Sequence, residues 1–247
     1  MTVQLIDKVN SAEFDLASFA KSWKDRKPET ILKWAFDYFG DTICVTSSFG
    51  ATSGALLHLA NKIKPGVPII FLDTYYHFAE TLQYKETLER LLNLNILTFR
   101  SSISREDFKL RYSPKLYSED PDLCCHLHKV LPMKEALGNF KAWVSGIRRG
   151  QTQARQSANF VERYEEGIVK INPLLEWTTK DVFSYMKENH IPGHPLSAKG
   201  YKSIGCWPCT QRVGENEDER SGRWQGHLKT ECGLHLFMRR SPETELQ

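Results

Sequence analysis

Two cysteine pairs place the strongest constraint on how this chain can fold. One pair is adjacent, Cys124-Cys125, and the other is spaced as Cys206-Trp207-Pro208-Cys209. A Cys-x-x-Cys spacing brings two sulfurs to one centre, as it does in zinc and iron–sulfur sites. If the four thiolates share one site, the middle of the chain must fold against its C-terminal third.

The spacing alone leaves the nature of that site open. Side chains of neighbouring helical residues diverge by about 100°. A single tetrahedral ion would strain to accept both Cys124 and Cys125, whereas a cuboidal cluster offers separate iron corners. This geometry favours an iron–sulfur cluster over zinc, and a set of unrelated buried thiols is the third interpretation.

Length and charge narrow the class of protein. With 247 residues, 40% of them hydrophobic, the chain can form one α/β domain with a C-terminal segment. It contains no apolar run long enough to span a membrane, and residues 1–10 do not resemble a secretory signal. We therefore expect a cytoplasmic protein, whose thiols stay reduced. A net charge of +3 does not suggest a nucleic-acid binder.

Hydrophobic periodicity predicts alternating helices and strands, which is typical of a parallel βαβ sheet. A helix should begin at Pro28 and end before Gly40. Another should run from Cys124 to Leu137, with Asp122 as its N-cap and a kink at Pro132. The remaining expected helices are 11–26, 55–61, 78–92, 105–111 and 178–189, and the expected strands are 42–47, 67–72, 95–99, 142–145 and 168–171.

Small residues follow the first expected strand. The loop Ser47-Ser48-Phe49-Gly50-Ala51-Thr52-Ser53 leads from that strand into a helix. Loop amides and a helix N-terminus both direct positive charge at an anion, so this arrangement can hold a phosphate. A tight strand-to-helix turn is the alternative. Leu72-Asp73-Thr74 ends the second strand and should flank the same ligand, because strand carboxyl ends meet at one edge of the sheet.

A further cysteine, Cys232, has different surroundings. It has no partner cysteine nearby in sequence, and Lys229, Arg223 and His235 are its neighbours. Cationic neighbours lower the pKa of a thiol and make it nucleophilic. Cys232 is therefore a candidate nucleophile, and an ordinary C-terminal cysteine is the alternative. Cys44 lies within the first strand and is expected to be a small buried core residue.

Several basic residues could converge on a small anionic ligand. Each of them, taken alone, is as readily explained as a solvated surface charge. Guanidinium groups bind phosphate or sulfate in a bidentate manner, which makes convergence attractive. The candidates are Lys129, Arg148, Arg149, Arg155, Arg220 and Arg223.

Taken together, the motifs identify a family. The chain resembles the assimilatory sulfonucleotide reductases, and most closely the bacterial, cluster-bearing, thioredoxin-dependent reductases of adenosine 5′-phosphosulfate (APS). The matching features occur in family order over roughly residues 30 to 235. They are Ser48-Phe49-Gly50-Ala51, Phe71-Leu72-Asp73-Thr74, Cys124-Cys125 with Lys129, Gly146-Ile147-Arg148-Arg149 with Gln151 and Arg155, Ile204-Gly205-Cys206 with Pro208-Cys209-Thr210, Arg220-Ser221-Gly222-Arg223-Trp224, and Glu231-Cys232-Gly233-Leu234-His235.

The resemblance implies a fold and a set of roles. The fold would be the adenine-nucleotide α-hydrolase-like three-layer α/β sandwich with a mostly parallel sheet. Residues 1–40 would form N-terminal helices, 41–205 the nucleotide-binding domain, and 206–247 a C-terminal segment. The four paired cysteines would hold a 4Fe–4S cluster. The loop Ser47 to Ser53, with Leu72 and Asp73, would bind the nucleotide. Lys129, Arg148 or Arg149, Arg220, Arg223 and His235 would contact the phosphosulfate.

The resemblance also implies a reaction. Cys232 would attack the sulfur of APS, release AMP and form an S-sulfocysteine, from which thioredoxin would release sulfite in assimilatory sulfate reduction. We expect a homo-oligomer. A reductase of the 3′-phosphorylated substrate (PAPS), or of both, is the nearest alternative. A zinc-stabilised nucleotide-binding protein and an ATP-pyrophosphatase-type transferase are rivals from other classes.

Two segments depart from the family pattern. Tyr75 follows the Leu-Asp-Thr triplet where glycine is frequent, and Thr52 and Ser53 stand where an acidic residue is frequent. These departures bear on the adenosine contacts more than on the chemistry.

Overall fold

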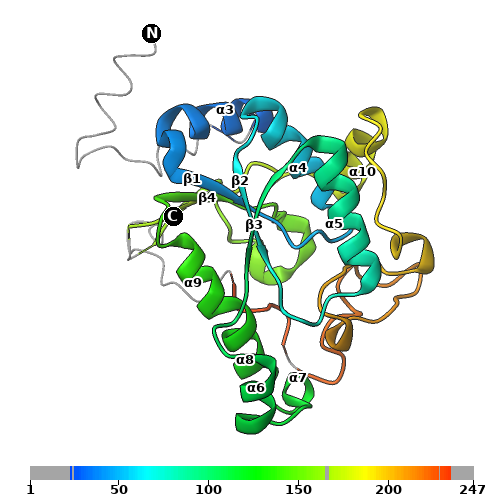
Figure 1. Ribbon diagram of the computed structural model, residues 1–247. Coiled ribbons are helices and arrows are strands. Elements are labelled where there is room, and N and C mark those ends of the chain that lie inside the picture. The colour runs from blue at the N-terminus through cyan, green and yellow to red at the C-terminus, as the bar shows by residue number, and fades with distance from the viewer. Residues whose placement is uncertain (1–22, 24, 165–166, 228, 235–247) are drawn as a thin grey trace.

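A computed structural model describes residues 23, 25–164, 167–227 and 229–234 (Figure 1). Within them, six strands form one sheet in the order β3-β2-β1-β4-β6-β5. Every neighbouring pair is parallel except β5 with β6, which is antiparallel. The strands are β1 Ile43–Thr46, β2 Pro68–Leu72, β3 Asn95–Phe99, β4 Ala142–Val144, β5 Val161–Arg163 and β6 Val169–Ile171.

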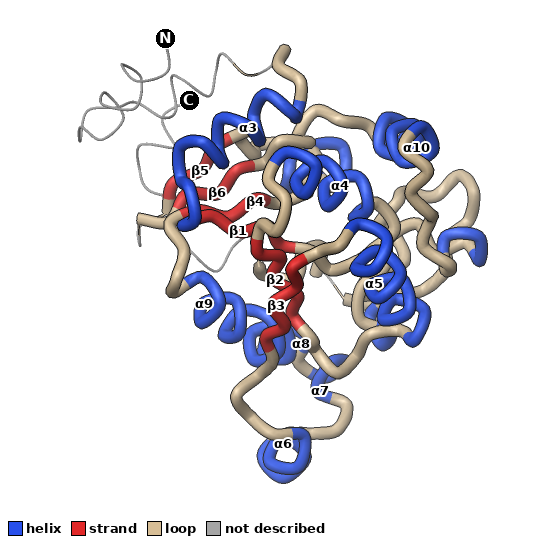
Figure 2. The backbone as a smooth tube through the Cα atoms, turned by 45° about the horizontal axis from the view of Figure 1, so that its top comes forward, coloured by secondary structure: helices blue, strands red, loops and turns tan. Residues whose placement is uncertain are grey.

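Helices lie on both faces of the sheet (Figure 2). One face is covered by α3 (Pro28–Phe39), α4 (Ser53–Ile63), α5 (Ala79–Leu92) and α10 (Thr179–Glu188), and the other by α9 (Leu131–Leu137). The shorter helices α6 (Arg105–Arg111), α7 (Leu116–Glu119) and α8 (Pro121–Cys125) extend beyond the sheet (Figure 1). This three-layer arrangement confirms the fold class expected from the sequence.

Alternation along the strands explains the two hydrophobic cores. In β1, Ile43 and Val45 pack into the larger core under α3 and α4, while Cys44 points into the smaller core with α9. Successive strand residues point to opposite faces, so a strand without polar positions must be covered on both sides. Cys44 is fully buried and donates to the carbonyl of Ala142, in agreement with its expected core role.

Helix boundaries follow local sequence signals. Pro28 opens α3, and Gly40 follows its last residue with φ of 55°, a conformation that favours glycine. Thr178 caps α10: its hydroxyl accepts from the amide of Asp181, whose carboxylate accepts from the amide of Thr178. Both helices were expected, whereas the edge strand β5 was not. The expected helix 11–26 lies almost entirely outside the described residues.

The helix expected from Cys124 to Leu137 is divided. It consists of α8, a π-helical turn at His126–Val130, and α9, which has Pro132 in its first turn. The expectation that Asp122 caps this segment is wrong. Asp120 is the cap, because its carboxylate accepts from the amide of Leu123 at 2.9 Å. The π-helical turn bears Lys129, and π turns of this kind are frequent at functional sites.

No helix in the described part of the chain combines the length and hydrophobicity that a membrane crossing requires.

Gly54 offers a test of the packing that supports the loop before α4. A Cβ added there would lie 2.8 Å from Cγ2 of Ile191 and 3.0 Å from the hydroxyl of Tyr84. Alanine favours helix by up to about 1 kcal/mol over glycine, whereas overpacking a core costs about 1–3 kcal/mol. We expect Gly54→Ala to lower the free energy of unfolding by about 1–2 kcal/mol in urea denaturation.

Gly193→Ala is the matched control, because nothing lies within 4 Å of a Cβ at that position. It should change the free energy of unfolding by less than about 0.5 kcal/mol. An equal effect of the two substitutions would contradict the packing described for Gly54.

Candidate active site

A cleft of about 230 Å³ opens at the carboxyl ends of the parallel strands. The loops after β1, β2 and β4 line it, together with residues 202–206, 219–220 and 223–224. Ligands of doubly wound sheets bind at this edge, because the chain diverges to both faces there. The Cys-x-x-Cys segment is tied to this edge by a hydrogen bond from the amide of Trp207 to the carbonyl of Tyr76 at 2.8 Å.

The loop after β1 has the features of an anion site. Ser47, Ser48, Gly50 and the loop as far as Ser53 line the cleft, and Ser53 begins α4. The hydroxyl of Ser47 accepts from the amide of Phe49, which has φ of 50°, and the amide of Ser53 bonds to the carbonyl of Gly50. A Cβ on Gly50 would lie 3.1 Å from the carbonyl of Ile204, so glycine permits this close approach.

Positive charge dominates the described lining of the cleft. Its only carboxylate is Glu219, and its cations are Lys129, Arg155, Lys202, Arg220 and Arg223. Arg223 lies with its guanidinium carbon 4.4 Å from the centre of the Trp224 ring and donates to the carbonyl of Cys209 at 3.1 Å. Such an excess of cations in one cleft attracts a small anion.

Lys129 and Arg155 are the most buried of these cations, each 9% exposed. Lys129 has no hydrogen-bond or ion-pair partner among the described residues. Burial alone would lower the pKa of Lys129, but the thiolates of Cys206, Cys232 and Cys125 raise it above its usual value. Lys129 therefore carries a charge at neutral pH, and that charge is directed at sulfur and at the cleft.

Cys232 is half-buried in the same cleft. Burial alone would raise the pKa of its thiol, but Lys129 and the amide of Leu234 lower it, so that the net shift is downward. A depressed pKa increases the fraction of thiolate, which is the nucleophilic form. By contrast, burial raises the pKa of the Cys44 thiol.

The four paired cysteines gather in a second, small pocket beside the cleft. Cys124, Cys125, Cys206 and Cys209 all line it. The hydroxyl of Thr74 lies 3.3 Å from the sulfur of Cys206, and Thr74, Lys129 and Cys206 line both cavities. Burial raises the pKa of Cys124 to about 12 and of Cys125 to about 11, so a cationic group would be needed to keep these thiols ionised.

All four paired thiols face one pocket, although no three His, Cys, Asp or Glu side chains among the described residues are arranged to hold one metal ion. His128 also lines this pocket, is 4% exposed, and has no hydrogen-bond partner for either ring nitrogen in the part of the chain described. Buried polar atoms without partners are rare and often adjoin a missing group.

Some residues singled out from the sequence do not line the cleft. Arg148 is buried and pairs with Glu219, while Arg149 points outward and pairs with Glu176. Phe49 is fully buried, and its ring packs edge-on against Phe71. Asp73 accepts from Arg100 at 2.9 Å and from the amide of Tyr75. His235 lies outside the described residues.

Other residues line the cleft that the sequence did not single out. His77 stacks on Phe71, Lys202 donates to the carbonyls of Glu215 and Glu217, and Trp224 lies under Arg223. Trp224 stands beside Arg223 in one of the quoted motifs, so that neighbourhood was an available signal. Nothing in the sequence around His77 indicated its position.

Tyr75 occupies a backbone conformation that glycine adopts freely. Its φ is 63°, in the left-handed region, where a residue with a Cβ is strained. The Asp73 carboxylate accepts from the Tyr75 amide, and the Arg100 guanidinium lies 5.8 Å from the centre of the Tyr75 ring. These contacts hold the turn after β2 in a conformation that glycine adopts more readily.

Comparison with known proteins gives consistent matches. Residues 42–212 match the phosphoadenosine phosphosulfate reductase domain. An adenosine 5′-phosphosulfate reductase of Streptomyces coelicolor is 45% identical over 83% of this chain and 86% of its own length. One of Lysinibacillus sphaericus is 42% identical over 83% of this chain and 89% of its own length.

Solved structures agree with the sequence comparisons. The phosphate complex of phosphoadenylyl-sulfate reductase from Candida auris superimposes with a TM-score of 0.68 at 31% identity, covering 82% of this chain and 98% of that one. FMN adenylyltransferase of Candida glabrata, at 16% identity and a TM-score of 0.54 over 83% of this chain and 72% of its own, shares the fold alone. The matched domain and the relatives span most of the chain, which therefore belongs to the phosphoadenosine phosphosulfate reductase family.

Proposed function

We propose that this chain is an adenosine 5′-phosphosulfate reductase of assimilatory sulfate reduction and cysteine biosynthesis. It would reduce APS to sulfite and AMP with thioredoxin as the electron donor. The observation that carries the proposal is the meeting of a half-buried thiol of lowered pKa, Cys232, with a small-residue loop and a set of cations in one cleft. The relatives that support APS as the substrate are 39–45% identical to this chain.

The first half of the reaction is a displacement at sulfur. The Cys232 thiolate attacks the sulfur of APS, an S–S bond forms, and the bond from sulfur to the bridging oxygen breaks. AMP leaves with that electron pair, and Cys232 carries a sulfonate as S-sulfocysteine. Lys129 and Arg223 would stabilise the charge that develops on the phosphate oxygen.

The second half is a thiol exchange. A thioredoxin thiolate attacks the Cys232 sulfur of the S-sulfocysteine, and sulfite leaves with the electron pair of the S–S bond. The second thioredoxin thiol then resolves the mixed disulfide and restores the Cys232 thiol. The two electrons that reduce the sulfur therefore come from the thioredoxin dithiol.

A 4Fe–4S cluster would be held by the four paired cysteines, Cys124, Cys125, Cys206 and Cys209. Their shared pocket and the burial of their thiols favour this ligand set. When bound, this group would supply electrostatic polarisation at the thiol end of the cleft. Thr74 and Lys129 line both pockets, so they are the residues of this chain that would orient the cleft relative to that group.

The loop residues Ser47, Ser48 and Gly50 would hold the α-phosphate, and Leu72 would lie against the adenosine. Arg220 and Arg223 would contact the phosphosulfate with Lys129 and His235. Arg148 and Arg149 do not line the cleft, and Arg155 lines it but pairs with Glu231, so none of these three arginines would be a main substrate contact. A cytoplasmic homo-oligomer is the form in which we expect the protein to act.

The substrate assignment is tested by steady-state sulfite release with thioredoxin and either nucleotide. We expect kcat/KM for APS to exceed that for PAPS by at least about tenfold. The reason is that the 3′-phosphate of PAPS would be a misplaced charged group, which weakens binding by about this factor. A preference for PAPS would overturn the substrate assignment and leave the reaction type intact.

Cys232→Ser should abolish turnover, because a hydroxyl of ordinary pKa replaces the thiolate. Its iron content should equal that of the unsubstituted protein, since Cys232 is not one of the four paired cysteines. Sulfite release at the normal rate by this variant would show that the nucleophile lies elsewhere.

Cys125→Ala should lose most of its iron, measured per chain after anaerobic purification, because one of the four ligands is removed. Cys44→Ala is the matched control: this thiol is buried in the core and lines neither pocket. Full iron retention in Cys125→Ala would contradict the ligand set.

Arg223→Gln should weaken AMP binding by about tenfold or more, because it removes a cation that no carboxylate of the described residues neutralises. Isothermal titration calorimetry measures this directly. Arg90→Gln, on the exposed surface of α5, is the control and should leave AMP affinity unchanged. Unchanged affinity in Arg223→Gln would remove Arg223 from the nucleotide site.

A further inference from the structure

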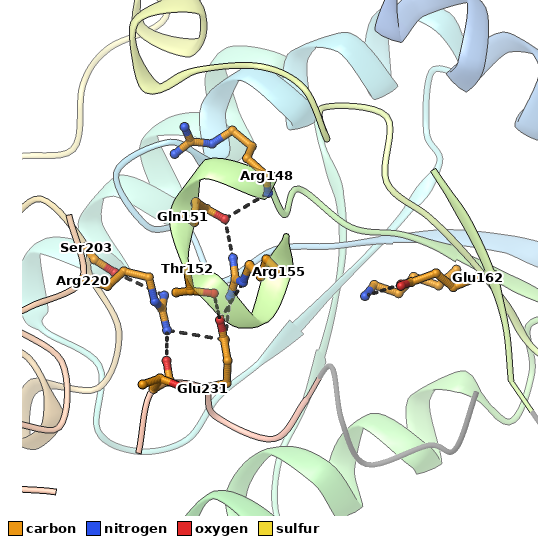
Figure 3. Close-up of polar contacts among 10 residues, drawn as sticks. Arg148, Gln151, Thr152, Arg155, Glu162, Ser203, Arg220 and Glu231 are labelled. Carbon is orange, nitrogen blue, oxygen red and sulfur yellow. Dashed lines mark hydrogen bonds and ion pairs between the residues drawn. The ribbon is translucent and has the colours of Figure 1, made fainter. Parts of the chain in front are cut away.

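The segment that bears Cys232 is fastened by the side chain of the preceding residue. Glu231 is 6% exposed, and each of its carboxylate oxygens has two partners (Figure 3). One oxygen accepts from Arg155 Nε at 2.7 Å and Thr152 Oγ1 at 2.9 Å. The other accepts from Arg155 Nη2 at 2.8 Å and lies 3.5 Å from Arg220 Nη2. We call this set of contacts the clasp.

The receiving side of the clasp is built into the loop that follows β4. Arg155 is 9% exposed, and its Nη1 donates to the side-chain oxygen of Gln151. The same oxygen accepts from the amide of Arg148 at 3.1 Å, as Figure 3 shows. Gln151 thus fixes the Arg155 guanidinium independently of Glu231. A guanidinium fixed in this way favours a bidentate pair of fixed geometry.

Two further contacts fix the residues just before Glu231. Arg220 Nη2 donates to the carbonyl of Thr230 at 3.1 Å. The Lys229 ammonium pairs with Asp122 of α8, beside the cysteine pair. Residues 229–231 are therefore held at three successive positions, and the clasp is the one buried from solvent.

The reaction places opposite demands on this segment. Attack on a bound nucleotide needs the Cys232 sulfur inside the cleft, where it now lies half-buried. Exchange with a protein dithiol needs the same sulfur to be reachable by a partner much larger than the cleft. The buried ion pair of Glu231 keeps the adjacent Cys232 sulfur inside the cleft. This placement suits attack on the nucleotide but hinders access by a protein dithiol.

We propose that Glu231 is a positioning residue whose clasp by Arg155 holds Cys232 in the cleft for the first half-reaction and must be released for the second. This inference rests on the proposed function for its two half-reactions. The existence of the clasp as a closing device can be tested without any substrate.

Carboxamidomethylation of Cys232 by iodoacetamide measures how often the segment opens. The holoenzyme is alkylated without nucleotide across a range of pH, and modification of the Cys232 peptide is followed by mass spectrometry. The rate on the high-pH plateau is compared, because every Cys232 is then a thiolate. We expect Glu231→Gln and Arg155→Gln each to raise that rate by about tenfold, since either change weakens the closed state.

The two variants remove opposite charges, and comparison on the plateau separates the clasp from electrostatics. Because every Cys232 is a thiolate on the plateau, an effect through the pKa of Cys232 alone would leave both plateau rates unchanged. Loss of the clasp raises both alkylation rates. The rate in the double variant should be close to that in either single variant, because both changes remove the same interaction. Glu215→Gln, an exposed carboxylate of a nearby loop, should leave the rate unchanged.

Single-turnover measurements with radiolabelled APS test the division between half-reactions. In Glu231→Gln, transfer of label to Cys232 should slow by about tenfold, while release of preformed label by thioredoxin should be as fast as in the unsubstituted protein or faster. Thr152→Ala removes one contact of the clasp and should give the same pattern with smaller changes, which keeps the test available if Glu231→Gln folds poorly.

Unchanged plateau alkylation in both Glu231→Gln and Arg155→Gln, or in Thr152→Ala if the first variant does not fold, would overturn the clasp. Slowing of both half-reactions together would also overturn it, because a structural defect acts on both. If the unsubstituted protein takes up no label on Cys232, the proposed function fails, and the alkylation result still decides the clasp.

Discussion

A buried ammonium group at the junction of two cavities is the constraint on which the rest of the site depends. Lys129 is almost fully buried and has no partner among the described residues, so its charge must be balanced by the Cys232 thiolate and by what the cleft binds. An isolated buried charge is costly unless an anion approaches it. The π-helical turn between α8 and α9 directs this side chain to that position, and both the cysteine pocket and the cleft are built against it.

Charge balance divides the cations of the cleft into two groups. Glu231 engages Arg155 fully and Arg220 in part, so these two arginines hold the segment with the nucleophile. Lys129 and Arg223 have no carboxylate partner in the described part of the chain, and they are left for the substrate anion. One cleft thus uses some cations to fasten its nucleophile and others to bind its ligand. This division explains why a cluster of positive charge is stable before any nucleotide arrives.

The sequence predicted those parts of the structure that depend on local signals. The parallel strands, the Pro28 and Thr178 helix starts and the loop after β1 all follow from periodicity, caps and small residues. One failure overlooked a local signal: Pro121 opens the helix, which makes Asp120 rather than Asp122 its cap. The other failures involve tertiary choices. The sequence does not distinguish Arg148, Arg149 and Arg155 from one another. In the structure, Glu219 and Glu176 engage the first two, and neither of these arginines lines the cleft. No local pattern reveals which arginine a distant carboxylate will bind.

The proposed reaction depends on the chemistry of one sulfur, that of Cys232. The most direct measurement is incubation of the holoenzyme with radiolabelled APS in the absence of thioredoxin, followed by non-reducing peptide mapping. We expect stoichiometric label on the peptide that contains Cys232, release of an equal amount of AMP, and loss of the label as sulfite when reduced thioredoxin is added. Sulfite release without a labelled protein intermediate, or label on any other cysteine, would contradict the proposed reaction.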